Sequence, residues 1–139
     1  MDSAELLARA KHFALDSLAF YRKLSKAPEA QVPGVQFYKA ATSAAINYRS
    51  SKRGRSRPDF ISKLGLAVEE IDEAVGWLEF MDEGGIATNR ALLGEATELC
   101  AILTASLTTA RANWEAEQAA RRQTKRARSI LVQFPEPKF

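Results

Sequence analysis

Cysteine and histidine are almost absent from this chain, which has one of each among its 139 residues, Cys100 and His12. A single cysteine cannot form an internal disulfide framework, and a single histidine leaves few ligands for a metal cluster and little material for a histidine-activated nucleophile. These classes are therefore nearly excluded. Cys100 is interpreted as a small core residue, and His12 as the surface partner of Asp16 one helical turn later.

Long apolar runs are also missing. No stretch approaches the roughly 20 apolar residues that a membrane span requires, and polar residues interrupt the N-terminal segment MDSAELLARAKHF, where a signal peptide would need an apolar centre. We therefore expect one soluble, cytoplasmic domain without a membrane partner. The length and the 46% hydrophobic content are sufficient for a single core.

Strand patterns are lacking before residue 129, because apolar residues recur there at the spacing of helices. A first helix is expected over 3–26, beginning at a capping box of Asp2 and Glu5. Its predicted buried stripe consists of Leu7, Ala10, Ala14, Leu18, Tyr21 and Leu24. The segment KAPEAQVPG contains two prolines and a glycine, so a short second helix is predicted only from about Phe37.

The second helix is expected to end near Ser50, and the third to begin at Ser56, whose spacing to Asp59 indicates another capping box. The buried seam predicted for the third helix is Phe60, Leu64, Ala67, Ile71, Ala74, Leu78 and Met81, and Gly84 and Gly85 are expected to form its C-cap. Thr88 is the predicted N-cap of the fourth helix. The seam of that helix is Leu92, Ala96, Leu99, Leu103, Ser106 and Ala110.

Four amphipathic helices with short connections predict an all-α, up-down-up-down four-helix bundle. We place the bundle domain at residues 1–115 and a basic helical extension and tail at 116–139. Trp77 is expected inside the bundle, whereas Trp114 either caps the bundle or lies between subunits.

Charge is distributed unevenly, although the net charge is only +3. Half of the 20 basic residues fall into two short segments. The first basic cluster is Arg49, Lys52, Arg53, Arg55 and Arg57, and the second basic cluster is Arg121, Arg122, Lys125, Arg126 and Arg128. Seven acidic residues and no basic residue occur between Glu69 and Glu83. Separated fields of both signs influence which partners a protein attracts.

One long segment, KAATSAAINYRSSKRGRSRPDFISKLGLAVEEIDEAVGWLEF, resembles the bacterial four helix bundle protein family. Members of that family include proteins encoded in intervening sequences of large-subunit ribosomal RNA genes. The resemblance continues through LLGEATELCAILTASLTTAR and covers roughly residues 10–111. Where many members have NIAEG, this chain has NYRSS, as in a more basic branch.

The resemblance implies a four-helix protomer that assembles as a ring-shaped homopentamer, and it implies no known enzyme activity. The accessory variability proteins of diversity-generating retroelements are a related group. They are similar in fold and in pentameric form, and they bind a reverse transcriptase and nucleic acid through basic surfaces.

Each basic cluster has two open interpretations. The first basic cluster is either a solvated connection between the second and third helices or a phosphate-binding patch, held in place by Tyr48 and Phe60 and repeated around a ring. The second basic cluster is either a tail that aids solubility or a further phosphate-binding surface. Binding to RNA or DNA through such surfaces would depend strongly on salt, because its energy comes largely from released counterions.

The acidic residues Glu69, Glu70 and Glu73 could suggest a di-iron site. Such a site requires Glu-x-x-His pairs on facing helices, and His12 has no glutamate three residues before it, so no metal or cofactor is expected. Glu69 and Glu73 are instead expected to face solvent or the arginines of a neighbouring protomer.

The tail, SILVQFPEPKF, carries four apolar residues in polar surroundings, namely Ile130, Leu131, Val132 and Phe134. It is either a docking peptide for a neighbouring groove or an unstructured terminus.

The sequence as a whole favours a non-enzymatic, oligomeric scaffold that binds nucleic acid or a nucleoprotein partner, such as a reverse transcriptase. The alternative is a purely structural protein–protein interaction oligomer that does not bind nucleic acid. Neither interpretation identifies a catalytic residue, because no nucleophile constellation, phosphate loop or metal set can be assembled from this sequence.

Overall fold

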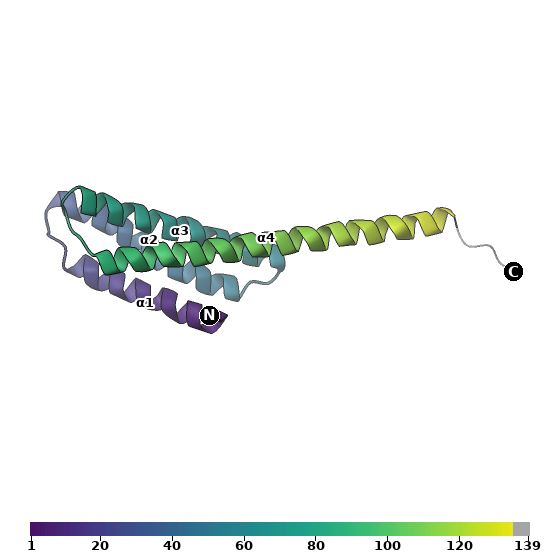
Figure 1. The fold of residues 1–139 in the computed structure, drawn as a ribbon, viewed down its shortest axis with the longest axis horizontal. Helices are drawn as coiled ribbons and strands as arrows, with labels where there is room; N and C mark the ends of the chain where they lie inside the picture. Colours follow the sequence, from purple (N-terminus) through teal and green to yellow (C-terminus); the bar gives the residue numbers. More distant parts are fainter. Residues whose placement is uncertain (135–139) are drawn as a thin grey trace. The chain divides into compact units, whose positions relative to one another are not determined.

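The computed structural model describes residues 1–134 and shows four helices, α1 (Ser3–Arg22), α2 (Pro28–Lys52), α3 (Arg57–Glu83) and α4 (Arg90–Gln133) (Figure 1). The chain divides into two compact units, Met1–Leu107 and Thr108–Phe139. In the first unit, α1, α2, α3 and the start of α4 pack in sequence as a bundle, and the chain reverses direction at each connection (Figure 1). The predicted all-α bundle is confirmed, whereas its pentameric assembly stays a prediction.

The core of the first unit combines apolar residues from all four helices. Phe13 of α1 and Phe37 of α2 meet edge to face, with their ring centroids 6.4 Å apart. Leucine, isoleucine and methionine side chains of α3 fill the centre, and burying each of them stabilises the fold by about 1.5–3 kcal/mol. The predicted seam of α3 is confirmed at Leu64, Ala67, Ile71, Ala74, Leu78 and Met81, while Phe60 is partly buried.

The stripe predicted for the first helix is confirmed in part, since Ala10 and Leu24 are buried and Leu7 and Tyr21 pack against the core. The remaining two positions differ, because α1 is apolar on two neighbouring faces. The core face carries Leu6, Ala10 and Phe13, while Ala14 and Leu18 from the predicted stripe line an outer groove. Helical spacing fits both stripes equally well, so it could not distinguish them. The capping box of Asp2 and Glu5 is confirmed by two hydrogen bonds, of 3.1 and 2.8 Å.

The second helix begins at Pro28, well before the predicted start near Phe37. Proline at the first helical position needs no N–H partner, so Pro28 opens the helix instead of preventing it. Pro33 and Gly34 then lie inside α2, and both are buried. A Cβ atom at Gly34 would collide with Leu24 Cδ1, so this glycine permits a close approach between α2 and the segment after α1.

The termini of α3 follow the predicted chemistry with one change. The Ser56 hydroxyl accepts a 3.2 Å hydrogen bond from the Asp59 N–H, but the Asp59 carboxylate accepts from the Arg55 N–H and so does not close a box with Ser56. At the C-terminus, Gly85 adopts φ +68°, as predicted. The N–H of Ile86 donates to Met81 C=O at 2.9 Å, which completes a Schellman motif.

The N-cap of α4 is Asn89 and not Thr88. The Asn89 side chain accepts a 3.0 Å hydrogen bond from the Leu92 N–H, whereas the Thr88 hydroxyl donates to Asp82 at 2.7 Å. The seam predicted for α4 is confirmed at Leu92, Ala96, Leu99, Leu103 and Ala110. Only Ser106 differs, because it is partly buried and Leu107 is buried instead.

Within the described residues, α4 is one helix that is long and apolar enough, by length and composition alone, to cross a membrane. Its apolar residues Leu92, Leu99 and Leu103 belong to the bundle core. The core helix of a bundle can pass the same test, although only 28% of this apolar stretch is buried within the protein.

Candidate nucleic-acid and protein interfaces

The first basic cluster is not a loop, because most of it belongs to helices. Arg49 and Lys52 lie in the last turn of α2, and Arg57 is the first residue of α3, so the connection itself contains only Arg53 and Arg55 from the cluster. All five side chains are exposed. The connection, the α2–α3 corner, is thus shorter than predicted, because α2 continues to Lys52 instead of ending near Ser50.

Aromatic rings hold one member of this cluster in place. Lys52 Nζ lies 5.3 Å from the ring centroid of Tyr48 and 5.4 Å from that of Phe60, a double cation–π contact. Tyr48 is buried, and this burial raises its pKa, an effect partly offset by a hydrogen bond with the Ser3 side chain. The anchoring role predicted for Tyr48 and Phe60 thus acts directly on a basic side chain.

Backbone contacts also restrict this corner. A Cβ atom at Gly54 would lie 3.1 Å from the backbone N of Phe60 and 3.1 Å from the carbonyl O of Ser51. The carboxylate of Asp59 accepts hydrogen bonds from the Arg55 N–H at 3.1 Å and from Lys63 Nζ at 3.2 Å. The first of these contacts contributes most to lowering the Asp59 pKa. The side chains of the cluster are exposed, while Lys52 and the backbone of the corner are held in place.

A groove of about 550 Å³ runs between α1 and α2, next to this corner. Its large apolar side chains include Leu15 and Ile46, which are 54% and 59% exposed. The lining also contains three basic residues and no acidic residue. The basic lining residues are Lys11, Arg49 and Arg53. Two members of the first basic cluster therefore border an apolar surface, which sequence reasoning did not predict.

The second basic cluster lies in the unit that begins at Thr108, on the C-terminal part of α4. All five of its side chains are exposed. Arg121, Lys125 and Arg128 line one shallow hollow of about 470 Å³, so they share a face of the helix. The guanidinium of Arg121 lies 6.0 Å from the ring centroid of Trp114. Trp114 is partly buried and packs against its own helix through this contact.

Residues of the predicted docking segment, 129–139, are helical as far as Gln133, and 135–139 lie outside the described residues. The apolar members of the described portion are all exposed, by 49% to 82%. They are Ile130, Leu131, Val132 and Phe134.

Most acidic residues of α3 are exposed, whereas Glu70 is partly buried. Burial raises the pKa of Glu70 first, and the charges of Glu73 and Glu69 raise it further. Trp77 Nε1 donates a 3.3 Å hydrogen bond to Glu73. Trp77 packs against the core, as predicted, but is only partly buried, and its ring meets Phe80 edge to face at 5.8 Å. Within residues 1–134, no three or more acidic, histidine or cysteine side chains gather in a potential metal site.

The two rare residues occupy the expected positions. His12 Nε2 lies 3.7 Å from the Asp16 carboxylate, and both side chains are exposed, so the predicted surface pair is present. Cys100 is partly buried against the core, and this burial is the main reason that its thiol pKa is raised. A raised pKa keeps the thiol neutral and therefore weakly nucleophilic near neutral pH.

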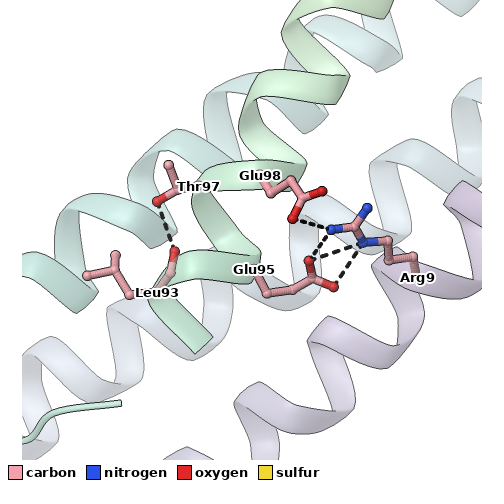
Figure 2. A network of polar contacts seen from close by, with 5 residues as sticks. All are labelled: Arg9, Leu93, Glu95, Thr97 and Glu98. Carbon is pink, nitrogen blue, oxygen red and sulfur yellow. Dashed lines mark hydrogen bonds and ion pairs between the residues drawn. The ribbon is translucent and has the colours of Figure 1, made fainter. Parts of the chain in front are cut away.

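One charged network was not found from the sequence. Arg9 of α1 reaches two glutamates of α4, with Nε donating to both oxygens of Glu95 at 3.1 and 3.0 Å and Nη2 lying 2.9 Å from Glu98 (Figure 2). The hydrogen bond to Glu95 is the main reason that the pKa of Arg9 is raised. Glu95 and Glu98 are three residues apart and so share a helix face, but one sequence gives no signal for the partner of that face.

Comparison with known proteins gives a match among the solved structures. No family model and no curated protein sequence matches this chain. A solved structure does match, with a TM-score of 0.71 and 25% sequence identity over 78% of this chain and 99% of the other. It is a protein of unknown function from the S23 ribosomal protein family of Bacteroides thetaiotaomicron. This chain is thus a four-helix protein whose structure matches a protein of the S23 ribosomal protein family.

Proposed function

We propose that this protein is a non-enzymatic, oligomeric scaffold that binds nucleic acid through its basic surfaces, alone or together with a nucleoprotein partner such as a reverse transcriptase. The segment that resembles the bacterial four helix bundle protein family and the structural match to an S23 family protein both support this proposal. In this view the chain is a member of that family and assembles as a pentameric ring in the cytoplasm.

The observation that carries the proposal is the second basic cluster. Its five bases lie within eight residues of one helix, all are exposed, and residues 118–134 contain no acid to neutralise them. A helix with such a face can follow the phosphates of a nucleic acid without reading its bases. Each phosphate that a base neutralises releases condensed counterions, and this release supplies most of the energy of non-specific binding.

The first basic cluster adds a second phosphate-binding surface. Because Lys52 is held over two rings and the connection is short, its charges lose little conformational freedom when a phosphate binds. Assembly into a ring would repeat this surface around an axis and strengthen its field.

The test of this proposal is the salt dependence of binding to duplex DNA and to structured RNA, measured by fluorescence anisotropy. Replacing Arg121, Lys125 and Arg128 with glutamine should weaken binding and make the slope of log K against log salt shallower by about 2 to 3. A matched control replaces three exposed bases elsewhere, Lys23, Lys26 and Lys39, with glutamine.

The control variant has the same net charge as the cluster variant, which makes the two comparable. If the cluster itself contacts phosphates, the control variant should retain most of the slope of log K against log salt that the parent protein shows. Equal slopes for the parent and the cluster variant would contradict the proposal. A second variant, with Lys52, Arg53 and Arg55 replaced by glutamine, measures the contribution of the first basic cluster in the same way.

The alternative, an interaction oligomer that does not bind nucleic acid, is favoured by one specific observation. The apolar groove between α1 and α2 exposes two large aliphatic side chains, and such surfaces are typical of protein contacts. If the parent protein binds neither RNA nor DNA at low salt, this alternative replaces the proposal.

A further inference from the structure

The α1–α2 groove has an apolar lining that the bundle buries only in part, since Leu15 and Ile46 stay exposed. Helix α1 devotes Leu6, Ala10 and Phe13 to the core, yet it carries a second apolar stripe on the adjoining face. That second stripe is Leu7, Ala14, Leu15 and Leu18. Ile46 of α2 lies on the opposite side of the same groove. An apolar stripe beyond the one that faces the core indicates a partner outside the protomer.

The charged residues at the groove indicate which kind of surface would bind there. Within residues 1–134, Lys11, Arg49 and Arg53 form no ion pair and no hydrogen bond through their side chains. A basic margin around an apolar floor favours an amphipathic helix with acidic residues beside its apolar ones. The occupant should therefore be an acidic and apolar helix face.

The outer face of α3 has this composition. Leu66 and Phe80 are 45% and 52% exposed, and Glu69 and Glu73 lie between them on the same side of the helix. Gly76 lies within this stretch, and a Cβ atom built there would have no neighbour within 4 Å. Nothing in the protomer thus requires glycine at this point, whereas a closely packed partner helix would.

The two surfaces also match in length. Leu66 and Phe80 are separated by fourteen residues of helix, and the α1 residues that line the groove, from Ala4 to Leu18, span fourteen residues as well. At 1.5 Å per residue each surface is about 21 Å long. Within one protomer they cannot meet, because the opposite side of α3, with Leu64, is buried against the bundle core.

We propose that the α1–α2 groove of one protomer receives the outer face of α3 from a second copy of the chain. Leu66 and Phe80 then cover the aliphatic floor, and Glu69 and Glu73 lie near Arg49 and Arg53. This inference rests on the proposed oligomeric scaffold and specifies the surfaces that build it. Because the two surfaces differ, every protomer keeps one of each available, so the contact propagates head to tail and closes into a ring if the rotation permits.

The first experiment measures mass by light scattering after size-exclusion chromatography, over a range of protein concentrations. Ile46→Glu and Phe80→Glu each place a charge in the interface at an exposed position, so the protomer should keep its helicity while the concentration of half-dissociation rises about tenfold or more. The matched control is Val32→Glu, which alters another exposed residue of α2 outside the groove and should retain the parent mass.

The second experiment tests charge complementarity. Arg49→Glu with Arg53→Glu should weaken assembly, as should Glu69→Arg with Glu73→Arg, and the chain with all four substitutions should regain the parent mass. A purely structural effect of the substitutions would not be reversed in the combined variant. The Phe80→Glu variant, in which both basic clusters are intact, is then titrated with RNA, so that assembly and nucleic-acid binding are judged separately.

Three results would overturn the inference. The parent protein could remain a monomer at micromolar concentrations, or Ile46→Glu and Phe80→Glu could both leave its assembly unchanged. Dissociation by Val132→Glu, with the groove variants unaffected, would identify the C-terminal segment as the contact instead. RNA binding that persists in a dissociated variant separates failure of this interface from failure of the proposed function.

Discussion

Arg9 shows how a single side chain can join two helices that are distant in sequence. Its guanidinium reaches Glu95 and Glu98 of α4 from the first half of α1, and the Arg9 and Glu95 side chains are only partly exposed (Figure 2). Bidentate geometry and a second carboxylate make this network stronger than an ordinary surface ion pair, although solvent still screens it. It fastens the first helix to the last one of the bundle.

We predict that Arg9→Gln lowers the free energy of unfolding by about 1 kcal/mol, because the two carboxylates lose their partner. A double-mutant cycle with Glu95→Gln, followed by urea denaturation, measures the coupling directly. The control, His12→Gln, removes the exposed pair with Asp16 and should change stability by less than about 0.5 kcal/mol. A coupling energy near zero would show that the contact in Figure 2 does not stabilise the fold.

Glu70 provides a pH-dependent prediction at the same scale. Its pKa is raised in the folded protein, first by burial and then by Glu73 and Glu69, so ionised Glu70 destabilises the fold at neutral pH. Glu70→Gln should therefore unfold at higher urea concentration than the parent at pH 7. Below the ordinary glutamate pKa of 4.5 the parent residue is protonated in both states, and the difference should vanish.

The exposed Glu79 serves as the control for this comparison, since Glu79→Gln removes a charge from the same helix without relieving burial. A stability gain for Glu70→Gln that is equal at pH 7 and at acidic pH would assign the effect to something other than ionisation.

Two helices illustrate how far sequence patterns determine an element. The seam of α3 was predicted residue by residue from Leu64 to Met81, because only one stripe of that helix has aliphatic residues at every turn. In α1 the predicted stripe was right in part: Ala10 belongs to the core, whereas Ala14 and Leu18 line the groove, because local spacing carries no information about which of two apolar faces meets the bundle. The second apolar face that causes this ambiguity is the face that lines the groove.

The start of α2 shows a different limit. Proline and glycine in KAPEAQVPG were interpreted as helix breakers, yet Pro28 begins the helix and Gly34 gives room to Leu24. Whether a glycine interrupts a helix or allows a close approach depends on a contact from elsewhere in the chain. The network of Arg9 could not be predicted for the same reason, because its partners come from a distant part of the chain. The basic residues of both clusters could be predicted, because each cluster is a local feature of the sequence.

Gly76 and Gly94 form a matched pair for a prediction at the scale of the helix. Each is exposed inside a helix, and a Cβ atom at either would meet nothing within 4 Å of the protomer. Alanine should therefore stabilise the protomer at both positions, by about 0.5–1 kcal/mol, because glycine costs more conformational entropy in a helix.

The two variants should differ in their assembly. Gly76→Ala should weaken self-association, because the added methyl group stands where the groove of a neighbouring protomer approaches, while Gly94→Ala should leave it unchanged. Analytical ultracentrifugation of both variants measures this difference. Equal association constants for Gly76→Ala and the parent would count against a close contact at α3.

At the scale of the whole molecule, the chain keeps its charges apart. Bases concentrate at the α2–α3 corner and on the C-terminal part of α4, and acids concentrate on α3. In the proposed ring the acidic face of α3 is used for assembly, which leaves the bases of α4 available for phosphates. In this proposal, separation of the charges would let one small protein bind both its own copies and a nucleic acid.

The measurement that tests the central claim most directly is the affinity of the parent protein for structured RNA and duplex DNA at about 50 and 200 mM salt. If the five bases of the second cluster bind phosphates, the plot of log K against log salt has a slope of about −4 or steeper, and affinity falls by a factor of about several hundred over this range. An absence of binding at the lower salt concentration, or an affinity that does not change with salt, would contradict the account.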